Sequence, residues 1–205
     1  MIVLALDLSK TSSGWAVGDG RTWLSGALKC PHKPPEDMKP TDIDAAYTGA
    51  IADWLRRSLH ALIEEHHPQY AAVEKPLPGN LTERKKFFRK DADMAGQSLV
   101  AVSAGGTSFA TTHHLHGLCY EACGLLYRKA IPTVFVAAQT WRRSLGIGQP
   151  PKGIKDRRKW LKAEATAQLK LRGFNISQPD AAEACCLGIH LLGALNIQAR
   201  VGQLL

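Results

Sequence analysis

Short apolar runs separated by polar turns mark the first part of the chain and recur later, and they predict β-strands. The first run ends in Asp7, and a Ser-Ser-Gly segment at residues 12–14 predicts the turn that leads to the second. The runs that predict strands are residues 2–7, 15–17, 22–28, 70–74 and 133–136. The first three predict an antiparallel meander.

Apolar residues spaced three and four positions apart predict helices between and after these strands. The clearest stripe begins at Thr41, with Asp44 as its capping partner, and it ends before Pro68. Further helices are predicted at residues 116–129, 155–171 and 180–195. The order strand–helix–strand predicts a parallel crossover. The elements therefore predict an α/β fold with a five-stranded mixed sheet flanked by helices. In this sheet an antiparallel meander is followed by parallel strands.

The length of 205 residues and the lack of a linker predict a single domain spanning 1–205. Residues 77–115 combine basic, aromatic and small residues, and we interpret them as an excursion from this domain. No apolar run is long enough to span a bilayer, and no export signal precedes the first strand. We therefore expect a cytoplasmic protein with no membrane partner.

Positive charge is concentrated in two stretches of a chain whose net charge is +8. The first stretch surrounds two adjacent phenylalanines, and the second runs from Arg142 to Lys162. Solvated helix faces could account for either stretch alone. Two such stretches favour a phosphate backbone as partner. The DNA-binding residues predicted from them are Arg84, Lys85, Lys86, Phe87, Phe88, Arg89, Lys152, Lys155 and Arg158.

The five cysteines are odd in number and show no paired spacing, so we expect free thiols. Two of them lie four residues apart within a predicted helix and follow three histidines, which leaves a zinc site as an alternative to ordinary helix packing. Packing is the interpretation we favour. The residues of this group are His113, His114, His116, Cys119 and Cys123.

Four carboxylates stand at the ends of predicted elements. Asp7 and Glu74 end the first and fourth strands, and these strands can be neighbours in a mixed sheet. Asp180 and Glu183 lie three residues apart at the start of the last helix and so project from one face. Singly, each acid could be a turn residue, a surface residue or a helix cap. Four that converge predict a site for two Mg²⁺ ions about 3.5–4 Å apart, which suits in-line phosphoryl displacement.

Three patches of sequence resemble the RuvC-type Holliday-junction resolvases of the ribonuclease H-like superfamily. They are the segment from Ile2 through Asp7 to Gly14-Trp-Ala-Val, then Ala-Val-Glu74, and then Asp180-Ala-Ala-Glu183-Ala. The resemblance implies a ribonuclease H-like fold and a homodimeric Mg²⁺-dependent endonuclease that makes paired nicks in four-way DNA junctions. It also implies two ions per active site, with Mn²⁺ able to substitute for Mg²⁺.

The resemblance assigns residue roles as well. It makes Asp7, Glu74, Asp180 and Glu183 the metal ligands and catalytic carboxylates, with Glu183 in a place where the bacterial members usually have Asp. A basic residue after the fifth strand should contact the scissile phosphate. Lys152 and Lys155 match that position, and Lys155 is the residue we assign to catalysis. Phe87 or Phe88 matches an aromatic that stacks at the crossover.

Other functions are weighed against this one. Cleavage of other branched DNA, such as flaps or three-way junctions, and a catalytically inactive DNA-binding protein on the same fold remain as alternatives. An actin-like ATPase half would need a second phosphate-binding glycine turn, for which Gly105-Gly106 lacks an acidic partner. A 3′–5′ exonuclease of the superfamily would need an acid two residues after Asp7, where the chain has Ser9.

Overall fold

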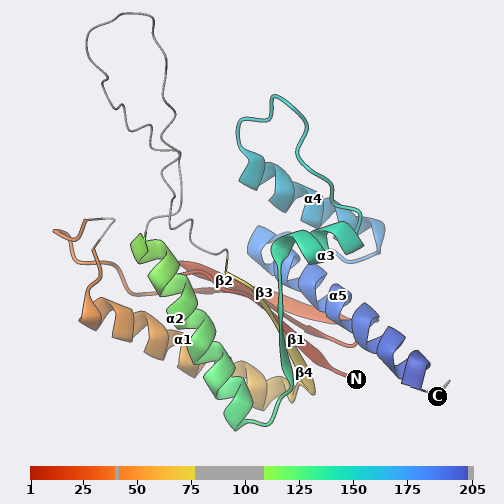
Figure 1. Cartoon of the computed structure of the whole chain (residues 1–205), viewed down its shortest axis with the longest axis horizontal. Coiled ribbons are helices and arrows are strands. Elements are labelled where there is room, and N and C mark those ends of the chain that lie inside the picture. Colours follow the sequence, from red (N-terminus) through yellow and green to blue (C-terminus); the bar gives the residue numbers. More distant parts are fainter. Residues whose placement is uncertain (40–41, 77–108, 203–205) are drawn as a thin grey trace, which may run out of the picture.

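The computed structural model describes residues 1–39, 42–76 and 109–202 (Figure 1). Its strands are β1 (Val3–Asp7), β2 (Ser12–Gly18), β3 (Trp23–Lys29), β4 (Tyr70–Glu74) and β5 (Thr133–Val136). Its helices are α1 (Ala45–His66), α2 (Phe109–Arg128), α3 (Ala138–Ser144), α4 (Arg157–Leu171) and α5 (Pro179–Gly202). Among the described helices, none combines the length and the apolar character that crossing a membrane requires.

The five strands form one mixed sheet in the order β3-β2-β1-β4-β5. β2 runs antiparallel to β1 and β3, while β4 runs parallel to β1 and β5. In the central pair Leu6 lies opposite Val73, so the next residue of each strand, Asp7 and Glu74, stands at the same edge of the sheet. The predicted fold class and the predicted neighbourhood of the first and fourth strands are confirmed.

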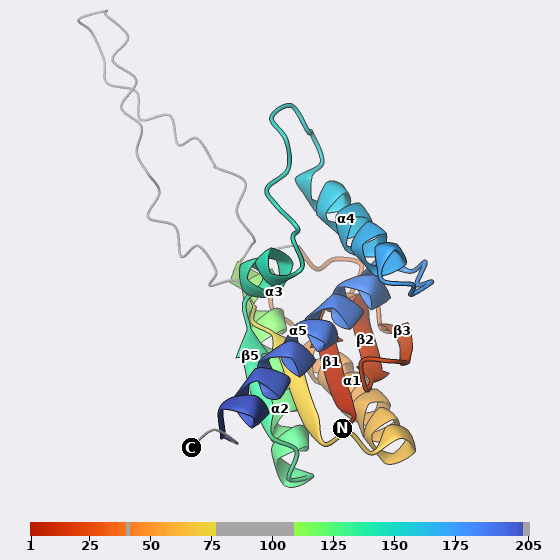
Figure 2. The same ribbon diagram turned by 90° about the vertical axis from the view of Figure 1, so that its right-hand side faces the viewer.

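Helices cover both faces of the sheet (Figures 1 and 2). Leu4 and Leu6 of β1 belong to the core shared with α1 and α2, whereas Val3 and Ala5 belong to the core shared with α5. Alternate residues of a strand point to opposite faces. Continuing this alternation, Asp7 points to the face that α5 covers.

Helix α5 crosses the sheet at close range because small residues face each other there. A Cβ atom built on Gly14 of β2 would lie 2.1 Å from the carbonyl oxygen of Asp180, and one built on Gly188 would lie 2.5 Å from the Trp23 ring. A larger residue at Gly14 would require the first turn of α5 to move, and one at Gly188 would require the Trp23 ring or the helix to move. Gly14 therefore allows the first turn of α5 to lie close to the sheet beside the carboxyl edge of β1.

Several predicted boundaries are wrong. Helix α1 begins at Ala45, not Thr41, because the Asp44 side chain accepts a hydrogen bond from the Tyr47 amide at 2.6 Å and is itself the N-cap. Residues 109–115 belong to α2 and not to an excursion, while residues 77–108 lie outside the described part of the chain. The short helix α3 was not predicted, since seven residues are too few to show a clear periodicity.

The Ser-Ser-Gly segment at 12–14 is not a turn but the beginning of β2. Ser13 is buried, and its hydroxyl accepts from the Ser9 amide at 3.0 Å and donates to the Ser9 carbonyl at 2.9 Å. The strand tolerates Ser13, a residue type common in turns, because the backbone of Ser9 provides both hydrogen-bond partners for the buried Ser13 hydroxyl. The change in assignment matters, since Ser12 then faces the candidate site.

Candidate metal centre

Three carboxylates from two distant parts of the chain converge at the carboxyl edge of β1. Oxygen atoms of Asp7, Asp180 and Glu183 all lie within 4.8 Å of one another, with Asp7 and Asp180 partly buried and Glu183 only 4% exposed. Asp7 ends β1, and the other two acids lie on the first turn of α5, one helical turn apart. Within residues 1–39, 42–76 and 109–202, no other set of three His, Cys, Asp or Glu side chains converges in this way.

Glu74 is the fourth predicted acid. It lies near enough for its charge to act on Asp7, but it is not one of the three acids whose oxygens all lie within 4.8 Å of one another. Its carboxylate accepts a hydrogen bond from the indole nitrogen of Trp141 at 2.8 Å. Trp141 belongs to α3 and is fully buried, so its N–H needs an acceptor inside the protein. The tryptophan thus orients Glu74. Sequence reasoning missed this role, although a lone tryptophan soon after the fifth strand was the available signal.

Burial and the charges of neighbouring acids shift Asp7 and Glu74 toward their neutral forms. Burial, followed by the charges of Glu74 and Glu183, raises the pKa of Asp7 well above its usual range. Burial also raises the pKa of Glu74, although the hydrogen bond from Trp141 works against it. A cation bound beside these two acids would favour their charged forms.

Asp180 differs from these two acids. Burial alone would raise its pKa, but hydrogen bonds from Lys162 and Ser12 outweigh burial and lower it. The Ser12 hydroxyl donates to Asp180 at 2.7 Å. Because Ser12 begins β2 and Asp180 begins α5, this bond ties the helix to the sheet at the site.

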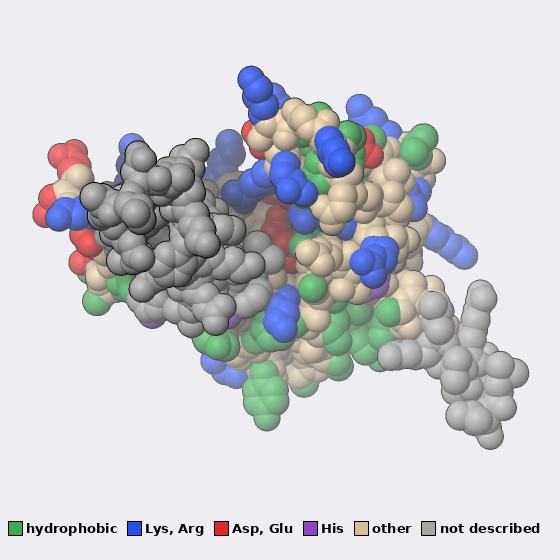
Figure 3. All heavy atoms as spheres, turned by 45° about the horizontal axis from the view of Figure 1, so that its top comes forward, with side chains coloured by type: hydrophobic (Ala, Val, Ile, Leu, Met, Phe, Trp, Pro, Cys, Tyr) green, Lys and Arg blue, Asp and Glu red, His purple; other side chains and the backbone are tan. Residues whose placement is uncertain are grey.

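Two basic side chains of the protein already contact the acids. The Lys162 ammonium forms an ion pair with Asp180 and lies 3.7 Å from a Glu183 oxygen. The Arg142 guanidinium donates to the other Glu183 oxygen at 2.7 Å. Both residues fall in the second basic stretch, but sequence reasoning placed neither in the site. Figure 3 shows carboxylates at the bottom of a hollow bordered by Lys and Arg side chains.

The basic residues predicted to bind phosphate differ in how they lie relative to the acids. Lys152 and Lys155 are exposed in the loop before α4, and neither forms an ion pair with the four acids. Arg158, on the first turn of α4, is near enough for its charge to lower the pKa of Glu74 and of Asp180. The first basic stretch, with Phe87 and Phe88, lies outside the described residues.

His114 and Cys119 of the histidine and cysteine group pack between α2 and its neighbours. His114 is buried, its Nδ1 donates to the Ala110 carbonyl at 2.7 Å, and its Nε2 lies 3.1 Å from the Thr48 hydroxyl of α1. Cys119 lies in the core that α1 and α2 share with the sheet. These contacts are the ones that the packing interpretation predicts.

Thiol reactivity tests this placement. Burial raises the pKa of Cys119 and of Cys186 to about 12, and it raises that of Cys185 as well. We expect these three thiols to react with Ellman's reagent only after unfolding, because the reactive thiolate is scarce and enclosed. Partly buried Cys30 should react first in the native protein. Rapid labelling of Cys119 in the folded protein, located by peptide mass mapping, would contradict the packing described.

The sheet order and the acids at the edge of its central strands define the ribonuclease H-like fold. Among solved structures, RuvC from Thermus thermophilus superposes with a TM-score of 0.54 at 12% sequence identity, covering 98% of this chain and 97% of that chain. Thermus thermophilus RuvC in complex with a Holliday junction substrate gives the same TM-score at 10% identity, covering 93% and 91%. The predicted resemblance to RuvC is confirmed at the level of the fold. No family model and no curated protein matches the sequence.

Proposed function

We propose that this protein is a metal-dependent, structure-specific DNA endonuclease that resolves four-way junctions by paired nicks. The observation that carries the proposal is the convergence of Asp7, Asp180 and Glu183 within 4.8 Å at the carboxyl edge of a ribonuclease H-like sheet. A junction as substrate is supported by the likeness to RuvC, which has been solved with a Holliday junction. The net charge of +8 supports a polyanionic partner.

The donor set fits Mg²⁺, with Mn²⁺ as a substitute. Mg²⁺ is bound by carboxylate oxygens together with substrate phosphates, and the cluster offers only carboxylates. Asp7, Asp180 and Glu183 would hold the ions, with Glu74 alongside. Burial, followed by the charges of Glu74 and Glu183, raises the pKa of Asp7, and a bound cation would oppose this shift. Bound there, divalent ions supply Lewis-acid stabilisation of phosphoryl oxygens and a more acidic water.

The protein's own residues position the reacting groups. Trp141 orients Glu74, and Ser12 holds Asp180. In this proposal Lys152, Lys155 and Arg158 bind the DNA backbone around the site, with Lys155 closest to the scissile phosphate, and Phe87 or Phe88 stacks on a base at the crossover. A four-way junction is cut symmetrically only if two sites act on it, so we also propose a homodimer.

The experiment is cleavage of a labelled immobile four-way junction with Mg²⁺. Linear duplex, a three-way junction and a flap of the same sequence serve as matched substrates, and Glu74→Gln serves as the matched protein control. We expect paired symmetric nicks in the four-way junction and no product without metal. Equal cutting of flaps or three-way junctions would broaden the substrate to branched DNA. Tight junction binding with no cutting by the wild type under Mg²⁺ or Mn²⁺ would show a DNA-binding protein without catalysis.

The role of Lys155 is tested by salt dependence. Replacing one phosphate-contacting lysine with alanine should weaken binding and reduce the slope of log K against log salt by about one. Lys170→Ala, an exposed lysine at the other end of α4, is the control and should leave the slope unchanged. An unchanged slope for Lys155→Ala in junction-binding titrations would remove this residue from the interface.

A further inference from the structure

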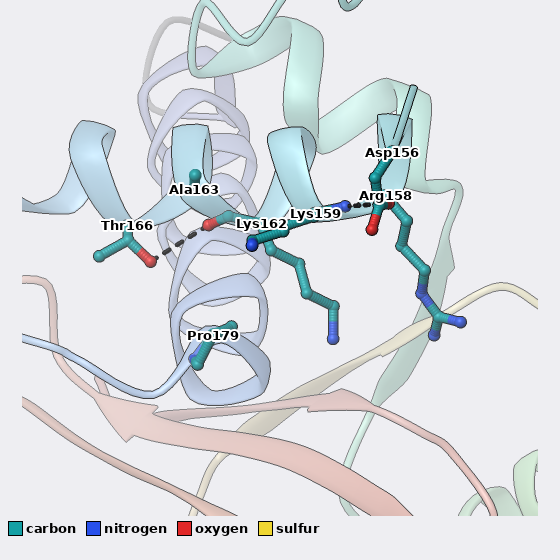
Figure 4. Close-up of a pocket in the computed structure, with 7 residues that line it drawn as sticks. All are labelled: Asp156, Arg158, Lys159, Lys162, Ala163, Thr166 and Pro179. Carbon is teal, nitrogen blue, oxygen red and sulfur yellow. Dashed lines mark hydrogen bonds between the residues drawn. The ribbon is translucent and has the colours of Figure 1, made fainter. Parts of the chain in front are cut away.

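A groove between α4 and the start of α5 lies next to the carboxylate cluster (Figure 4). It is open to solvent and has a volume of about 430 Å³. Arg158, Lys159 and Lys162 line it, and its one acid, Asp156, is engaged as the helix cap that accepts from the Lys159 amide at 2.9 Å. The groove is therefore suited to an anionic occupant.

Lys162 belongs to both the groove and the cluster. Its side chain lines the groove and extends from α4 toward the sheet (Figure 4), where its ammonium pairs with Asp180 and Glu183. The side chain is 23% exposed, so it can be reached from solvent. Of the three basic residues that line the groove, Lys162 alone forms ion pairs with the acids among the described residues.

Lys162 and a divalent cation would compete for the same carboxylate oxygens. An ammonium within ion-pair distance of Asp180 and Glu183 would be repelled once these acids hold a doubly charged ion. Lysine carries its charge on a flexible four-carbon stem, so the ammonium can move while the helix stays in place. The groove that its stem already lines is the nearest alternative environment.

Arg142 contacts the cluster in a different way. Its guanidinium lies 4.9 Å from the centroid of the Trp141 ring and donates to Glu183, whose side chain is only 5% exposed. It does not line the groove. The contact with the Trp141 ring restrains Arg142, and Arg142 does not line the groove, so Lys162 is the side chain placed to exchange partners.

We propose that Lys162 couples cation binding to strand binding. It rests on Asp180 and Glu183 in the free protein, and it contacts a backbone phosphate of the DNA strand in the groove when these acids hold a divalent cation. The inference rests on the proposed function, because it takes a DNA strand as the occupant of the groove. Lys162 is then a positioning residue, and each ligand strengthens the binding of the other by the same factor.

Cation binding without DNA is the first measurement. Titration calorimetry with Mn²⁺ compares the wild type with Lys162→Met and with Lys159→Met, a matched variant that loses a groove lysine but no ion pair to the cluster. We expect Lys162→Met to bind Mn²⁺ about tenfold more tightly, because the competing ammonium is gone, and Lys159→Met to match the wild type. Equal or weaker Mn²⁺ binding by folded Lys162→Met overturns the proposal.

Junction affinity with and without Ca²⁺ is the second measurement. Ca²⁺ is also bound by carboxylate oxygens. We expect Ca²⁺ to tighten junction binding of the wild type about tenfold more than that of Lys162→Met, and Lys159→Met to be weakened equally in both conditions. The same gain from Ca²⁺ in wild type and Lys162→Met overturns the coupling.

Two controls separate the possible failures. Melting curves establish that the variants fold, and Lys162→Gln, with the same expected results, replaces Lys162→Met if the latter does not. If the wild type binds no DNA, both the proposed function and the coupling are contradicted. If the wild type binds or cuts junctions and Ca²⁺ tightens junction binding equally in the wild type and Lys162→Met, only this inference is contradicted.

Discussion

Asp7→Asn is expected to abolish cleavage of a four-way junction while junction binding stays equal or becomes tighter. The substitution replaces an oxygen of a proposed metal ligand with an amide nitrogen and removes one of the converging negative charges, and that charge repels phosphate when no metal is bound. The loss should exceed the 10–100-fold that is typical for groups lying behind metal ligands, so we expect more than about 100-fold. Single-turnover cleavage and binding in Ca²⁺ measure the two effects separately. Loss of binding in parallel with cleavage would contradict the assignment.

The same variant should stabilise the metal-free protein at neutral pH. The pKa of Asp7 is raised in the folded state by burial and by the neighbouring acids, so folding favours its protonated form. That contribution is present at pH values below the unfolded pKa and is lost as pH rises through the folded pKa. Asparagine cannot ionise, so Asp7→Asn avoids the free energy of unfolding that is lost when the buried carboxyl ionises. Each kcal/mol of unfolding free energy recovered in this way raises Tm by about 2–4 °C. The gain should vanish at acidic pH, and a lower Tm at neutral pH would contradict the crowding of charge described here.

Gly14→Ala is expected to cost both stability and cation binding. Its Cβ would lie 2.1 Å from the Asp180 carbonyl oxygen, a backbone atom that can yield only if the first turn of α5 moves. Forced overpacking typically costs about 1–3 kcal/mol, which corresponds to a Tm lower by several degrees. Because that turn carries Asp180 and Glu183, Mn²⁺ affinity should fall as well.

The matched control is Gly49→Ala in α1. Nothing lies within 4 Å of a Cβ at Gly49, and alanine is the better helix former, so Tm should stay level or rise. Thermal unfolding and Mn²⁺ titration are run on both variants. A Gly14→Ala protein that melts and binds Mn²⁺ like the wild type would show that the close approach of α5 is dispensable.

The sequence by itself predicted the strands of the sheet and placed four acids at the ends of predicted elements. Apolar runs that end in Asp7 and Glu74 show both the strands and their carboxyl ends, and the three-residue spacing of Asp180 and Glu183 is a local property of a helix. These inferences need only neighbouring residues. They fail at residues 12–14, where Ser and Gly indicate a turn locally but the close contact with α5 requires small residues in a strand.

Only the tertiary structure decided which side chains surround the acids. Trp141, Arg142 and Lys162 come from α3 and α4, far from Asp7 and Glu74 in the sequence. Nothing in the local pattern separates Arg142 and Lys162 from the other basic residues of their stretch, and a tryptophan after the fifth strand does not by itself show which acid it contacts. A strand or helix is set by short-range periodicity. A hydrogen bond to Glu74 or an ion pair with Asp180 depends instead on how α3, α4 and α5 pack over one face of the sheet.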